Sequence, residues 1–132
     1  MKPINTGLAL RPIGLALVFL VGTAGCGQNA SPSDPVEGRT LLLAALEAWK
    51  GGEKPETLTS QDPPLHVADG DWMSGLRLVN FRAAEEGRLI GTDVNYDVVL
   101  EMKNPRGKSI RRDAVYAVTT HPQRLVLRQD SL

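Results

Sequence analysis

The sequence predicts a small α+β domain in which one N-terminal helix packs on a four-stranded antiparallel sheet of meander order. Two patterns carry this prediction. Apolar residues recur at helical spacing over residues 34–50, and from Leu76 onward they alternate with polar residues at the period of two that strands show. Because 132 residues, 42% of them hydrophobic, suffice for one core, we expect a single domain over residues 34–132.

The helix is expected to begin at Asp34, which can cap it, with Pro35 at the first helical position. Glu37 stands where a capping box requires an acidic side chain. Two glycines directly after Lys50 are expected to end the helix. Its apolar stripe comprises Leu42, Leu46 and Trp49.

A long connection follows over residues 53–74, which are rich in Pro, Gly, Asp, Thr and Ser. A connection of this length in a small domain is either functional or contains short elements. We therefore expect a helical turn near Pro55 to Leu58 and an edge strand over Leu65 to Val67.

Four strands are predicted after this connection, over residues 76–84, 93–103, 109–120 and 124–129. The second is the clearest, because its apolar residues fall on one face. That face comprises Val94, Tyr96, Val98, Leu100 and Met102. Residues 104–108 are expected to form a hairpin turn, and the pair His121-Pro122 should break the third strand.

A different pattern precedes the domain. Residues 1–11 carry Lys2 and Arg11 and no acid, and an uninterrupted apolar run follows from Ile13 to Val21. The run is shorter than the roughly 20 apolar residues that a membrane-spanning helix needs. We therefore predict that residues 1–25 are an export signal.

The signal ends in Thr23-Ala24-Gly25-Cys26, which resembles the lipobox of bacterial lipoproteins over the first 26 residues. The resemblance implies cleavage before Cys26, a diacylglyceryl group on its thiol, and a protein that is exported and anchored in a membrane. Residues 26–33 would then be the lipidated cysteine and a flexible spacer. Gly27, rather than an aspartate, implies the outer membrane in a Gram-negative organism. The alternative is an ordinary secretory cleavage site with a free thiol.

The order of one helix and four strands also resembles that of the cystatin-like rolls, including the ketosteroid-isomerase-like group. This resemblance covers about residues 34–130 and rests on element order alone. It implies a helix lying in the concave face of a curved sheet.

Two functions are compatible with these features. The first is a non-catalytic, lipid-anchored envelope domain that binds another envelope protein or a surface component, because no known catalytic motif occurs in the chain. The alternative is a small ligand-binding or isomerase-like enzyme with a pocket between helix and sheet, using Asp97 or Asp113 as acid or base. The single cysteine excludes thiolate metal clusters, the formal net charge of zero gives no case for a nucleic-acid partner, and we expect no cofactor.

The candidate binding residues are Trp72 and a group of cations around the predicted hairpin. Trp49 and Trp72 could together form a stacking platform for a sugar or a peptide. Trp49 lies on the apolar stripe of the helix and is therefore expected in the core, whereas Trp72, as a loop residue, can face either way. The cations are Lys103, Arg106, Lys108, Arg111 and Arg112. They could contact anionic headgroups or phosphates, or simply keep the hairpin in solvent.

No metal site is expected. The only histidines, His66 and His121, have no metal-binding spacing, and Asp69-Gly70-Asp71 lacks the further ligands of a calcium loop. We expect this triplet to be a turn that carries Trp72 back onto the core.

Overall fold

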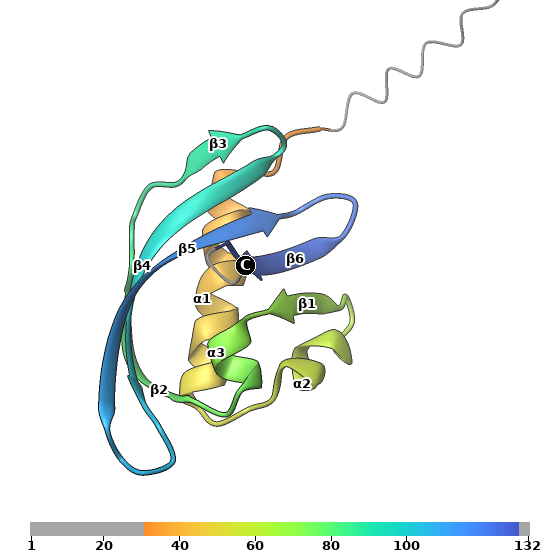
Figure 1. Ribbon diagram of the computed structural model, residues 1–132. Coiled ribbons are helices and arrows are strands. Elements are labelled where there is room, and N and C mark those ends of the chain that lie inside the picture. Colours follow the sequence, from red (N-terminus) through yellow and green to blue (C-terminus); the bar gives the residue numbers. More distant parts are fainter. Residues whose placement is uncertain (1–30, 130–132) are drawn as a thin grey trace, which may run out of the picture.

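A strongly curled sheet wraps around one long helix in the computed structural model, which describes residues 31–129 (Figure 1). Helix α1 (Pro35–Lys50) lies against the concave side of the sheet, and two short helices, α2 (Pro55–Thr59) and α3 (Gly70–Met73), lie near its C-terminal end. The strands are β1 (Leu65–Ala68), β2 (Arg77–Ala83), β3 (Arg88–Ile90), β4 (Asp93–Lys103), β5 (Ser109–Thr119) and β6 (Arg124–Arg128). The predicted α+β class is confirmed.

The sheet is larger than the four-stranded meander that we predicted. Strands β2, β4, β5 and β6 are antiparallel neighbours in the expected order. However, β1 adds to β6 in parallel and β3 pairs with β4, so the sheet is mixed and has six strands. Strand β1 confirms the edge strand expected over Leu65 to Val67, but its parallel pairing was not predicted, because it depends on the edge of β6, which a distant segment supplies. Strand β3 was not predicted, because its three residues are too few to show a period.

Asp34 begins α1 as predicted. Its Oδ1 accepts hydrogen bonds from the backbone N–H groups of Val36 at 2.8 Å and Glu37 at 3.4 Å. The other half of the predicted capping box, a hydrogen bond from the N–H of Asp34 to the side chain of Glu37, is not formed. The N–H of Asp34 donates instead to Oγ1 of Thr120 at 3.0 Å, and the Glu37 carboxylate faces Arg124 at 3.4 Å.

The core lies between α1 and the inner face of the sheet. The predicted apolar stripe of the helix and the predicted inner face of β4 are both buried, each residue being at most 2% exposed. Tyr116 and Val118 of β5 complete the packing from the neighbouring strand. Side chains therefore fill the centre of the space between helix and sheet, which is where the ligand-binding alternative would need its pocket. At the edge of this space a hollow of about 470 Å³ lies between α1 and residues 85–87.

Ser33 ties the start of the described chain to one end of the molecule. Its N–H donates to the carbonyl of Thr92 at 2.8 Å, and its Oγ accepts from the N–H of Thr120 at 2.9 Å. Ser33, which the sequence places in a flexible spacer, is thus buried within the folded domain. We call this end, with Ser33 and the turns after β3 and β5, the tether end.

The predicted signal over residues 1–25, Cys26 and the spacer as far as residue 30 lie outside the described residues. Among residues 31–129, no helix is both long enough and apolar enough to cross a membrane.

Candidate binding site

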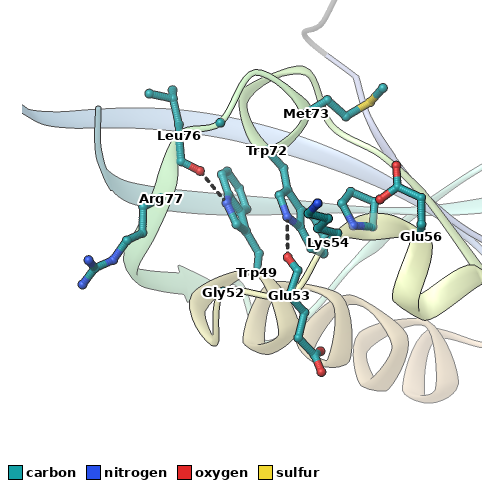
Figure 2. Close-up of a pocket in the computed structure, with 11 residues that line it drawn as sticks. Trp49, Gly52, Glu53, Lys54, Glu56, Trp72, Met73, Leu76 and Arg77 are labelled. Atoms are coloured by element: carbon teal, nitrogen blue, oxygen red, sulfur yellow. Dashed lines mark hydrogen bonds between the residues drawn. The ribbon is translucent and has the colours of Figure 1, made fainter. Parts of the chain in front are cut away.

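A pocket at the C-terminal end of α1 brings the two tryptophans together (Figure 2). Trp49 of α1 and Trp72 of α3 stack with their ring centroids 5.6 Å apart and their planes 8° from parallel. The Nε1 of Trp49 donates to the carbonyl of Leu76 at 2.8 Å, and the Nε1 of Trp72 donates to the carbonyl of Glu53 at 2.9 Å. Both indoles are therefore locked in place by stacking and by a backbone hydrogen bond.

The walls of this pocket are partly apolar and partly charged. Its volume is about 440 Å³. Trp72 is only 7% exposed, so it belongs to the core and contributes an edge of the wall, whereas Met73 beside it is 70% exposed. Charged side chains surround these residues, namely Glu53, Lys54, Glu56 and Arg77. The pocket thus offers an apolar surface surrounded by charges of both signs.

Asp69 stabilises the start of α3, the short helix that carries Trp72. Its Oδ1 accepts from the backbone N–H groups of Asp71 at 2.9 Å and Trp72 at 3.3 Å, which caps the short helix α3. The predicted turn at this triplet is therefore the first turn of a helix. It directs the indole onto the core as expected, where the indole stacks on Trp49.

A buried charged cluster, which sequence patterns did not indicate, holds α3 on the sheet. Nη1 of Arg128 lies 3.2 Å from Oδ1 of Asp69 and 2.9 Å from Oδ2 of Asp71, and the hydroxyl of Tyr116 donates to Oδ2 of Asp69. The side chains of Arg128 and Asp69 are 2% and 1% exposed. Burial, and then the negative charge of Asp69, raise the pKa of Tyr116 far above its ordinary value. A periodic pattern of apolar and polar residues does not predict that an arginine at the end of β6 points inward.

The predicted cations lie around the turn between β4 and β5. Lys103, Arg106, Lys108 and Arg111 are exposed. Arg112 is also exposed, but its Nε is 3.5 Å from Oδ2 of Asp71, so it partly belongs to the buried cluster. The side chain of Asn104 accepts from the N–H groups of Arg106 and Lys108 at 2.9 Å each, which fixes the shape of the turn.

The pocket and this hairpin share one end of the molecule. Arg77, which lines the pocket, is directly opposite Lys103, the last residue of β4 before the turn. The hairpin extends beside the C-terminal end of α1, far from the end where the chain enters at Ser33 (Figure 1). We call this end, with the tryptophan pocket and the β4–β5 hairpin, the distal end.

The remaining candidates do not form a site together. Asp97 is exposed and lies 2.7 Å from Arg88, and hydrogen bonding to that guanidinium lowers its pKa. Asp113 is also exposed, so neither aspartate is a buried acid. His66 lies half-buried on β1, and His121 is exposed after β5. Among residues 31–129, no three His, Asp or Glu side chains are grouped so that they could hold a metal ion.

Comparison of the chain with protein-family models, with curated proteins and with solved structures finds no match. The two resemblances described above therefore rest on the lipobox residues and on element order. Any function has to be argued from the surfaces of the domain and from the way the chain enters it.

Proposed function

We propose that this chain is a lipid-anchored cell-envelope protein whose folded domain binds an envelope protein or a surface component through its distal end, without catalysis. One observation carries the proposal. The chain enters the domain at the tether end, whereas the tryptophan pocket and the exposed cations lie at the other end of α1. Sixteen helical residues separate the two ends by about 24 Å. A lipid on Cys26 would thus hold the domain by one end and present the other.

The chemistry of the distal end favours a partner with anionic groups. Five exposed cations on the β4–β5 hairpin lie at the same end as an apolar pocket with Met73 at its edge. Apolar surface supplies affinity, and charge complementarity supplies orientation and a faster encounter. Acidic protein surfaces and phosphate-bearing surface components both meet this description.

The architecture agrees with the cystatin-like resemblance in that a curled sheet surrounds a helix. In the proposal, however, binding occurs on the outside of the roll. The interior is occupied by tightly packed residues such as Leu42, Tyr96 and Leu100, each fully buried. This filled interior is the reason for preferring the binding function to the ligand-binding or isomerase-like alternative.

The anchor is tested by comparing the full chain with its Cys26→Ser variant after expression in a bacterium that processes lipoproteins. The parent protein should partition into the detergent phase and carry the mass of attached acyl chains, because two or more chains hold a protein firmly in a bilayer. The variant should remain in the aqueous phase. Equal partitioning and no added mass in either protein would refute the anchor.

The binding function is tested by photocrosslinking in intact cells. A crosslinker at Met73 or Arg106, both at the distal end, should capture a defined partner, and Lys108→Glu should reduce the yield several-fold. Arg82→Glu is the matched control, because Arg82 is an exposed cation on β2 away from the pocket and the hairpin. The same crosslinks from Met73 and from the outer face of β2 would contradict a dedicated distal surface.

A further inference from the structure

We infer that the tether end of the domain docks on the lipid bilayer itself, with Leu89 and Ile90 of β3 and Val36 of α1 in contact with the headgroup and acyl boundary. This inference rests on the lipid anchor of the proposed function and adds an orientation to it. Most soluble domains show single exposed apolar residues, so the argument depends on where these three lie.

Exposed apolar side chains gather where the chain enters. Val36 is 78%, Ile90 56% and Leu89 54% exposed. Val36 follows Ser33 by three residues, and Ile90 precedes Thr92, whose carbonyl accepts from the N–H of Ser33. Figure 1 shows β3 and the start of α1 at the end from which the chain leaves toward its N-terminus.

The pairing of β3 explains why Leu89 and Ile90 are not covered by other parts of the domain. Leu89 lies opposite Val94, which faces the core, so Leu89 is on the inner face of the sheet at its rim. Ile90 lies opposite Asp93 and therefore points to the other face. Among the described residues, β3 has β4 as its only strand partner, which leaves an apolar edge open.

The length of chain before the domain selects the bilayer as the occupant. Only six residues lie between Cys26 and Ser33, and this stretch can span at most roughly 25 Å even when fully extended. A lipid on Cys26 therefore keeps the tether end at the membrane surface at all times. Apolar side chains held this close gain a second, weak attachment to the interface, of the kind that strengthens an existing lipid anchor.

Three of the carboxylates near the tether end already have partners, whereas Glu85 and Glu86 are exposed and line one hollow with Val36 and Arg39. Asp34 caps α1, Asp93 accepts from Oγ1 of Thr119 at 2.9 Å, and Glu37 lies 3.4 Å from Arg124. These three carboxylates thus already have donors or a cation, which reduces their repulsion from anionic headgroups. The β4–β5 hairpin is up to about 35 Å away along the eleven residues of β4, so it would point away from the same bilayer.

The test uses the lipidated full chain in vesicles of phosphatidylethanolamine and phosphatidylglycerol that contain a lipid-borne fluorescence quencher. Lipidation consumes the thiol of Cys26, the only cysteine, so an introduced cysteine is the sole site for a thiol-reactive fluorophore. Ile90→Cys is the probe, and Met73→Cys is the matched control, because Met73 is similarly apolar and exposed but lies at the distal end. Quenching should be several-fold stronger at position 90 and should fall to the control level when Leu89→Asp is added.

The outcomes separate this inference from the anchor. Acyl mass on the protein with equal quenching at positions 90 and 73 would overturn the docking and leave the anchor standing. Absence of acyl mass would overturn the anchor and the docking with it. A third outcome is that the fluorophore at position 90 becomes shielded from solvent without vesicles, and more so as the protein concentration rises. This result would assign the patch to a contact with a second copy of the chain and would also overturn the proposal.

Discussion

The hydroxyl of Tyr116 on β5 donates a hydrogen bond to the carboxylate of Asp69 at the start of α3, and both residues are buried. Forty-seven residues of sequence separate them. The contact holds α3, which carries Trp72, against the sheet. It therefore helps to position the tryptophan pocket at the distal end.

Replacing Tyr116 with Phe is expected to lower the free energy of unfolding by about 1–3 kcal/mol, because a buried carboxylate loses a donor while the ring keeps its place. Urea denaturation measures the change. Ser60→Ala is the control: its hydroxyl donates to the carbonyl of Glu56 at an exposed site, and its removal should change stability by less than about 0.5 kcal/mol. Equal effects of the two substitutions would contradict a structural role for the buried bond.

The only two tyrosines of the chain should resist alkali as long as the domain is folded. Burial raises the pKa of both Tyr96 and Tyr116 above 10.0. The unfolded chain then releases these protons at a lower pH than the folded chain. The contribution of the two tyrosines to the free energy of unfolding is therefore fully present below pH 10.0 and is lost as the pH rises beyond it. Phenolate absorbance should therefore increase together with the loss of circular dichroism. Phenolate formation near pH 10 in a folded domain would refute this.

Arg128→Met should destabilise the domain by about 3–5 kcal/mol, because it leaves Asp69 and Asp71 without their buried cation. Arg124→Met is the matched control on the same strand; its pair with Glu37 is about one-third exposed, and its loss should cost about 0–1 kcal/mol.

The charge explanation for Arg128 is tested further by adding Asp69→Asn and Asp71→Asn to Arg128→Met. Neutral amides no longer require a buried cation, so part of the lost stability should return. A triple variant that is less stable than Arg128→Met would show that packing, rather than charge, dominates at this site.

Gly87→Ala should destabilise the domain by about 1–3 kcal/mol through overpacking. A Cβ at this position would lie 2.3 Å from Cγ1 of Val94 and 2.8 Å from the ring of Tyr96, and both neighbours are fully buried. The neighbouring substitution Glu86→Ala, at an exposed site, should be nearly neutral in the same thermal unfolding experiment. An unchanged unfolding temperature for Gly87→Ala would mean that the turn before β3 can move away from the core.

Asp97 should titrate below the ordinary range for an aspartate, because the Arg88 guanidinium donates to its carboxylate from 2.7 Å. A pH titration followed by carboxyl NMR should show its pKa returning toward 3.8 in the Arg88→Gln variant. An unchanged pKa would indicate that solvent outcompetes this exposed pair.

Local patterns account for the elements that were predicted correctly. The bounds of α1 follow from a capping aspartate, a proline at the first helical position and two glycines after Lys50. The whole of β4 follows from apolar residues at every second position. These signals lie within one element, so they can be recognised without knowledge of the rest of the chain.

The candidate site could be predicted only in pieces. Trp49, Trp72 and the hairpin cations were each conspicuous, but no local pattern indicates that two indoles 23 residues apart would stack or that Arg77 would lie opposite Lys103. The inward position of Arg128 was also unpredictable, because a buried cation depends on carboxylates supplied by a distant turn. The lipid on Cys26 stays a prediction, since that residue lies outside the described part of the chain.

The sequence alone determined the α+β class, the start of the helix and the inner face of the central strand, because spacing within a segment dictates which residues can share a face. Only the tertiary structure decided that the sheet has six strands, that a buried Asp69, Tyr116 and Arg128 cluster supports α3, and that the tether and the tryptophan pocket lie at opposite ends. Those features are contacts between distant segments, and their energy exists only once the chain has closed around a common core.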